Sequence, residues 1–161
     1  MKKRFEIIIL RSLAFFAITV FFKLIRKPPL KDWLIIFFFK SYMASIIDNF
    51  LVKKGYLKYP VRIFKFIDYS FLFSYLIFPI ACVYYNQVTR NSNIIGILLK
   101  CIIFTLPSTV AEFYLEKYTD LIKYKKNWNA NYSFVTIALT FLLVRGFIGI
   151  VRKTSNLEKK G

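Results

Sequence analysis

Histidine is absent from this sequence, and cysteine and glycine are scarce: its 161 residues include two Cys and five Gly. Without His the chain lacks the commonest general base and metal ligand, and no Ser–His or Cys–His nucleophile can form within it. Cys82 and Cys101 lie in apolar runs without a CxxC spacing, which indicates buried core residues rather than a zinc, haem or iron–sulfur site. The sequence also has no glycine-rich phosphate loop. These absences predict a protein that is not an enzyme and holds no cofactor or metal.

Acidic residues are few as well. Eight Asp and Glu stand against 25 Lys and Arg, so the formal charge is +17, while 57% of the residues are hydrophobic and 20% are aromatic. This chain is too apolar for a soluble domain and too aromatic for a disordered basic tail. Its cations are dispersed, with no helix-turn-helix, RNP-like or zinc pattern, so we expect no nucleic-acid partner. The composition predicts a basic protein of the cell membrane whose cations meet anionic lipid headgroups.

Long apolar segments recur along the chain, several of them close to the roughly 20 residues that cross a membrane. We predict an all-α bundle of about five transmembrane helices, with four as the alternative, in one membrane-embedded domain over residues 1–161. The expected spans are about 7–25, 33–51, 66–85, 94–114 and 132–151. Pro28-Pro29 separates the first two, and Pro79 and Pro107 predict kinks. In the alternative with four spans, residues 64–70 lie flat at the interface.

The distribution of positive charge predicts the orientation. With five spans, Lys and Arg are more numerous on the side of the amino terminus, which is therefore expected in the cytoplasm. The fourth helix is expected to continue beyond the membrane towards Trp128.

Six ionisable residues inside the expected spans are candidates for a special role, because each costs a few kcal/mol to insert. Because a helix rises about 1.5 Å per residue, an alternating bundle sorts these residues into two layers. One leaflet would hold Arg11, Asp48 and Glu112, and the opposite leaflet would hold Lys40, Lys100 and Arg145.

Each layer permits more than one interpretation. In the first layer, Arg11 would pair with Asp48 or Glu112, or the side chains would reach to the near interface. The second layer has three cations and no anion. They would reach lipid headgroups, form a site for a lipid phosphate or a small anionic solute, or meet another protein.

Two further patterns are candidates for packing or binding. Small residues precede Asp48 in the second span, namely Ser41, Ala44 and Ser45, and they predict a helix-packing face or, alternatively, a solute pathway. Carboxylates recur every four residues at Glu112, Glu116 and Asp120, which predicts an acidic helical face. That face would pair with nearby cations or hold Mg²⁺ or Ca²⁺ in a membrane enzyme.

Several short motifs lie in the middle and later parts of the chain: Tyr59-Pro60-Val61-Arg62, Glu112, Glu116, Thr119 and the run Lys123-x-Lys125-x-x-Trp128. They resemble a family of small, uncharacterised multi-span membrane proteins of spore-forming Gram-positive bacteria, and the similarity covers about two-thirds of the chain. The resemblance implies a membrane location and four or five helices, without an established reaction.

The function expected from the sequence is therefore that of an integral membrane protein that binds lipid or joins a membrane complex, with other membrane proteins or itself as partner. The alternative is a small transporter or channel subunit for an ion or an anionic solute, with Asp48, Glu112 and the cation layer on its route.

Overall fold

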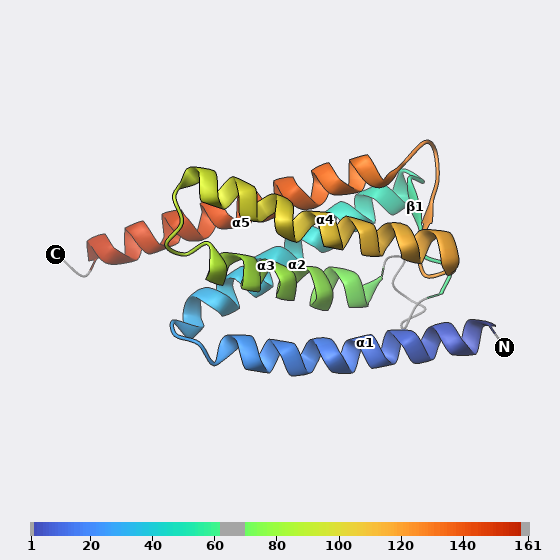
Figure 1. The fold of residues 1–161 in the computed structure, drawn as a ribbon, viewed down its shortest axis with the longest axis horizontal. Coiled ribbons are helices and arrows are strands. Elements are labelled where there is room, and N and C mark those ends of the chain that lie inside the picture. The colour runs from blue at the N-terminus through green and yellow to red at the C-terminus, as the bar shows by residue number, and fades with distance from the viewer. Residues whose placement is uncertain (1, 62–69, 159–161) are drawn as a thin grey trace.

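The computed structural model describes residues 2–61 and 70–158, which form a bundle of antiparallel helices (Figure 1). Its α-helices are α1 (Lys2–Ile25), α2 (Leu30–Lys53), α3 (Phe78–Val88), α4 (Ile94–Tyr118) and α5 (Ala130–Glu158). A π-helical turn, η1 (Phe73–Ile77), leads directly into α3, and two short strands are β1 (Leu57–Lys58) and β2 (Lys123–Tyr124). The predicted all-α bundle is confirmed, whereas the number of transmembrane helices among the described residues agrees with the alternative of four better than with five.

Four of the helices are long and apolar enough to cross a membrane: Arg4–Ile25, Leu30–Lys53, Ile94–Tyr118 and Ala130–Leu157. Many of their large apolar side chains face outward, including Phe15, Ile94 and Ile150. An apolar surface of this extent is typical of a protein that contacts lipid rather than water. The chain therefore has the architecture of a multi-pass membrane protein.

The third predicted span differs from the other four. Residues 66–69 lie outside the described ranges, and from 71 the chain is helical to 88, which is roughly 27 Å at 1.5 Å per residue. The π-helical turn ends two residues before Pro79. Proline has no backbone N–H to donate to the carbonyl four residues earlier, and its ring clashes with that carbonyl. The wider π-helical turn therefore lies where the α-helix is expected to be strained. Pro107, by contrast, lies inside a continuous α4. The alternative with 64–70 flat at the interface falls outside the described residues apart from Ser70.

The two strands join distant connections of the chain. β1, which follows α2, pairs antiparallel with β2, which follows α4, with Leu57 opposite Tyr124 and Lys58 opposite Lys123. Gly55 has φ +77° in the turn before β1, a conformation that glycine adopts without strain. Next to the strands, the backbone nitrogen of Lys125 also donates a hydrogen bond to the backbone carbonyl of Tyr56. One end of the bundle, which also holds the amino terminus, is thereby covered, and the carboxyl terminus lies at the opposite end (Figure 1).

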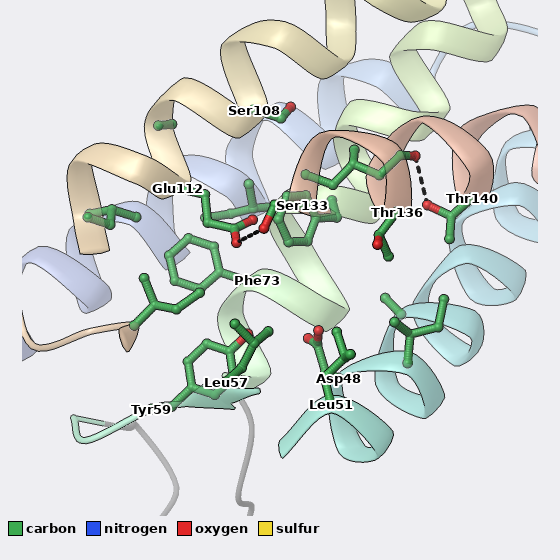
Figure 2. Close-up of a pocket in the computed structure, with 18 of the residues that line it drawn as sticks. Asp48, Leu51, Leu57, Tyr59, Phe73, Ser108, Glu112, Ser133, Thr136 and Thr140 are labelled. Atoms are coloured by element: carbon green, nitrogen blue, oxygen red, sulfur yellow. Dashed lines mark hydrogen bonds between the residues drawn. The ribbon is translucent and has the colours of Figure 1, made fainter. Parts of the chain in front are cut away.

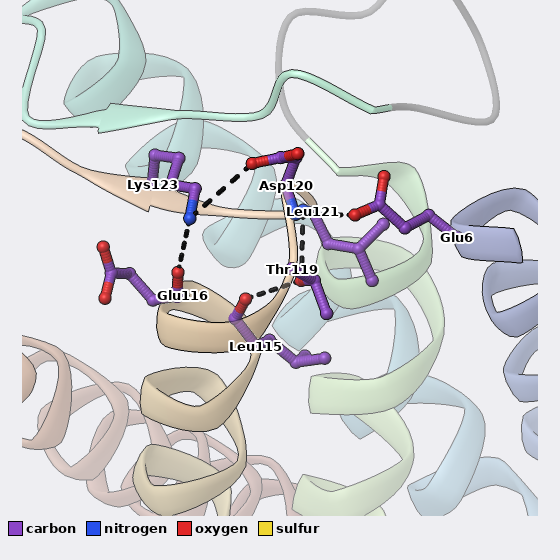
Figure 3. Close-up of polar contacts among 7 residues, drawn as sticks. All are labelled: Glu6, Leu115, Glu116, Thr119, Asp120, Leu121 and Lys123. Carbon is purple, nitrogen blue, oxygen red and sulfur yellow. Dashed lines mark hydrogen bonds and ion pairs between the residues drawn. The ribbon is translucent and has the colours of Figure 1, made fainter. Parts of the chain in front are cut away.

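The predicted continuation of the fourth helix towards Trp128 is wrong. α4 ends at Tyr118 because side chains bind its last carbonyls: Thr119 Oγ1 donates to Leu115 O at 2.5 Å and Lys123 Nζ donates to Glu116 O at 2.7 Å. Both contacts are visible in Figure 3. The chain then turns into β2, where pairing with β1 replaces the helical hydrogen bonds.

α1 lies along one side of the bundle, where Leu10 packs in a cluster with Leu72 and Leu121 (Figure 1). A polar contact accompanies this packing. Glu6 is 3% exposed, and its Oε1 accepts a hydrogen bond from the backbone nitrogen of Asp120 at 2.9 Å (Figure 3). This carboxylate ties the start of α1 to the segment that follows α4.

We predict that Glu6→Ala lowers the free energy of unfolding by about 1–3 kcal/mol, because a backbone donor loses its charged acceptor. Unfolding in mixed detergent micelles measures the loss. Arg11→Ala, an exposed position on the same helix, is the matched control and should change the value by less than about 0.5 kcal/mol. Equal losses in the two variants would contradict the assigned role of Glu6.

Candidate functional site

A partly enclosed cavity of about 100 Å³ lies between α2, α4 and α5, beneath the strand-covered end of the bundle. Each helix contributes positions spaced three or four residues apart, which is the spacing of one helical face. α2 contributes Lys40, Ala44, Ile47, Asp48 and Leu51; α4 contributes Ser108, Ala111, Glu112 and Leu115; α5 contributes Ser133, Thr136, Ile137 and Thr140. Leu57, Tyr59, Phe73, Ile122 and Trp128 complete a mostly apolar wall together with Ile77 and Phe78.

Two carboxylates project into this cavity from opposite sides, Asp48 from α2 and Glu112 from α4 (Figure 2). Asp48 Oδ2 accepts a hydrogen bond from Ser74 Oγ in η1. The same serine hydroxyl also contacts the carbonyl of Ser70 at 3.0 Å. The sequence placed Asp48 and Glu112 in one layer, and the structure brings them into one cavity.

Glu112 is held by a chain of hydroxyl and indole donors. Its Oε1 accepts from Ser133 Oγ at 2.7 Å and from Tyr124 OH at 3.0 Å. Ser133 Oγ in turn accepts from Trp128 Nε1 at 2.9 Å. The carboxylate of α4 is therefore connected to the indole of the α4–α5 connection through one serine hydroxyl.

Two tyrosines at the covered end of the cavity keep their protons. Burial raises the pKa of Tyr59 well above its usual range, and the charges of Asp48 and Glu112 raise it further. Burial also raises the pKa of Tyr124, and Glu112 adds to that shift. Both phenols therefore stay neutral well beyond physiological pH and can donate hydrogen bonds to the carboxylates or to a ligand.

Lys40 lies in the same cavity, although the sequence placed it in the opposite layer. It is 3% exposed; its Nζ donates to Thr140 Oγ1 at 2.5 Å and lies 5.2 Å from the ring centre of Phe141. Lys40 and Asp48 are eight residues apart and therefore share a face of α2. The long lysine side chain brings its ammonium group to the cavity, so an argument from backbone depth alone misplaces it.

The other two cations of the predicted layer meet at the carboxyl end of α3. Lys100 Nζ donates to Val88 O at 3.0 Å and to Ser92 Oγ at 2.9 Å, and Arg145 Nη2 donates to Thr89 O at 3.1 Å. Cations are favourable at this end of a helix, where carbonyls lack partners. Lys100 and Arg145 therefore lie at the same helix end, whereas Lys40 lies in the cavity, and the three cations do not form the expected common layer.

The expected pairing of Arg11 is not formed either. Arg11 is exposed on α1, and within the described ranges it makes no ion pair with Asp48 or Glu112. Around Leu10 this helix packs against Leu72, Leu121 and the turn η1, and Arg11 is not among the residues that line the cavity.

The small-residue stretch of α2 is buried, as a packing face requires. Ser41, Ala44 and Ser45 are 4%, 6% and 8% exposed. The hydroxyls of the two serines donate to carbonyls of their own helix, Phe37 O and Tyr42 O. Of the three residues only Ala44 lines the cavity, so this stretch supports packing better than a pathway.

The predicted acidic helical face of Glu112, Glu116 and Asp120 is wrong. Asp120 lies beyond the end of α4, where it pairs with Lys123 at 3.7 Å, and Glu112 alone faces the cavity. Across residues 2–61 and 70–158, no three His, Cys, Asp or Glu side chains gather closely enough to hold a metal ion. The early end of α4 removes the arrangement on which the metal hypothesis depended.

Sequence reasoning missed Tyr59, Trp128 and Ser133 as cavity residues. Ser133 and Glu112 could have been related through the facing turns of consecutive antiparallel helices, since both lie near the same connection. No signal in the sequence locates Tyr59 there, because its position depends on the pairing of β1 with β2.

We predict that Ser133→Ala lowers the free energy of unfolding by about 1–3 kcal/mol, because Glu112 loses a donor and the Trp128 indole loses its acceptor. Unfolding in mixed detergent micelles is again the measurement. Ser155→Ala, exposed near the end of the same helix, is the control. An equal result for the two variants would show that the hydroxyl relay contributes no stability.

Comparisons of the chain with protein-family models, with curated proteins and with solved structures found no match.

Proposed function

We propose that this chain is a protein of the cell membrane that holds a small solute in the cavity between α2, α4 and α5, as a binding component or a transport subunit. One observation carries the proposal: three ionisable side chains, Asp48, Glu112 and Lys40, face a common cavity inside a bundle suited to hydrocarbon. Such groups are costly within a membrane and face a polar partner or a solute route.

The geometry favours this function over a purely structural role for the charges. A structural cluster would be expected to close into direct ion pairs, which exclude solvent. Within the described ranges, neither Asp48 nor Glu112 forms an ion pair with Lys40, although all three line the same space. Groups that remain separated around a cavity are arranged to receive something between them.

The exterior of the bundle supports the membrane part of the proposal. Exposed aromatic and aliphatic side chains cover the long helices, whereas cations lie at helix ends and in connections, as in Lys53, Lys54 and Lys126. We propose anionic lipid headgroups as the partners of these terminal cations.

A test of the proposal is whether water and small charged molecules reach the cavity. Ser108→Cys places a thiol on the cavity wall, and Leu106→Cys places one on the outward face of the same helix. We predict that 2-aminoethyl methanethiosulfonate modifies Ser108→Cys at least about tenfold faster in proteoliposomes, because the reactive thiolate forms in water and not in lipid. Mass spectrometry of the intact protein measures the rate.

The unmodified chain is the background control, since Cys82 and Cys101 are 0% and 3% exposed and should remain unlabelled. If both engineered thiols are equally unreactive, the cavity is sealed, and a structural component of a membrane complex becomes the better description.

A further inference from the structure

We propose that the solute held in the cavity is a small organic cation, a primary ammonium compound with a short apolar tail, bound between Asp48 and Glu112. This inference rests on the proposed function and adds the chemical class of the ligand. The charge of the cavity, its unused polar atoms, its wall and its size each support it.

Each carboxylate keeps one oxygen available. Glu112 Oε1 takes both hydrogen bonds, from Ser133 and Tyr124, and among the described residues its Oε2 has no hydrogen-bond partner. At Asp48 the serine hydroxyl of η1 occupies Oδ2 and leaves Oδ1 without a partner in the same ranges. The neighbouring donors hold both side chains in position, so the free oxygens are oriented before a ligand arrives.

Tyr59 supplies an independent sign of a missing partner. Its side chain is 5% exposed and lines the cavity, yet its hydroxyl has no hydrogen-bond partner within the described ranges. Figure 2 shows Tyr59 on the side of the cavity where Leu57 also lies, beneath Glu112 and beside Asp48. The side chain is enclosed but its hydroxyl is open to the cavity, where a polar ligand or a bound water is the usual partner of such a group.

The balance of charge selects a cation. Two carboxylates and one ammonium group line the cavity, which leaves one net negative charge when all three are ionised. Lys40 is also occupied, because its Nζ bonds Thr140 and lies over the rings of Phe78 and Phe141. An anionic solute would meet two like charges here and a lysine that already has a partner.

The wall and the volume select a small organic ion over an inorganic one. Most of the lining is apolar, with the rings of Phe73 and Trp128 and the side chains of Leu51, Leu57 and Leu115. Because a cavity of about 150 Å³ accommodates benzene, a cavity of about 100 Å³ accommodates about four or five non-hydrogen atoms. A bare metal ion would leave this apolar wall in contact with water.

Trp128 makes occupancy measurable. The indole lines the cavity and is linked through Ser133 to Glu112, so a ligand on Glu112 changes its surroundings. The chain has one other tryptophan, Trp33, which lies buried in the cluster with Ile36 and Cys82. In the variant Trp33→Phe, the emission spectrum therefore reports on the cavity alone.

The experiment titrates purified full-length Trp33→Phe protein in detergent with butylammonium, and with butanol and butyrate as uncharged and anionic analogues. We expect the Trp128 emission to change with butylammonium and to reach saturation. Butanol and butyrate should bind at least about tenfold more weakly, because butanol lacks the charge that strengthens the hydrogen bond and butyrate is repelled by the carboxylates. Calorimetric titration of the unsubstituted protein gives the same ranking without dependence on that variant.

Matched variants assign the binding groups. Asp48→Asn and Glu112→Gln keep the shape and a hydrogen-bond acceptor, and each should weaken butylammonium binding at least about tenfold. Glu116→Gln, one turn further along α4 and outside the cavity lining, should leave the affinity unchanged. Tyr59→Phe should weaken it by a few fold.

The outcomes separate this inference from the proposed function. If butanol binds as well as butylammonium, or if Asp48→Asn and Glu112→Gln bind it unchanged, the ammonium assignment is overturned. If butyrate alone binds, Lys40 is the anchor and the ligand class is anionic. A labelled Ser108→Cys together with absent butylammonium binding overturns the ligand class and leaves the solute cavity standing, whereas failure of both removes the two proposals.

Discussion

Hydrocarbon offers no partners to a charge, so each ionised group enclosed by this bundle needs polar partners within the bundle, from the protein or from what the cavity holds. That constraint explains the arrangement around the cavity. Serine and tyrosine hydroxyls hold Asp48 and Glu112, and Thr140 with two aromatic rings holds Lys40. The helices α2, α4 and α5 can surround these side chains only in the order and register that bring the donors into place. The polar interior therefore determines how these apolar helices pack.

Hydropathy and helix geometry predicted most of the architecture. The second span was expected at 33–51 and α2 extends from Leu30 to Lys53, because an apolar run of this length needs a helix to satisfy its backbone in lipid. The strands were not predictable in the same way. Each contains two residues within a basic, aromatic connection, and local pattern carries no information on such a pairing between distant segments.

The site was predictable only in part. Asp48 and Glu112 were candidates because ionisable side chains are costly inside a membrane span, and their similar depths in antiparallel helices placed them in one layer. The predicted layer of Lys40 was wrong because the depth was calculated for the backbone, whereas a lysine side chain extends further than one helical turn. Tyr59 and Trp128 come from connections whose positions depend on tertiary pairing. Arg11 was assigned a partner because depth alone does not say which helices are neighbours.

The ladder between β1 and β2 has a mechanical consequence. It fastens the connection that follows α2 to the connection that follows α4, so these helices cannot part at that end unless the backbone hydrogen bonds break. The two strands thus restrict any separation of α2 and α4 most strongly at the end of the bundle that also holds the amino terminus.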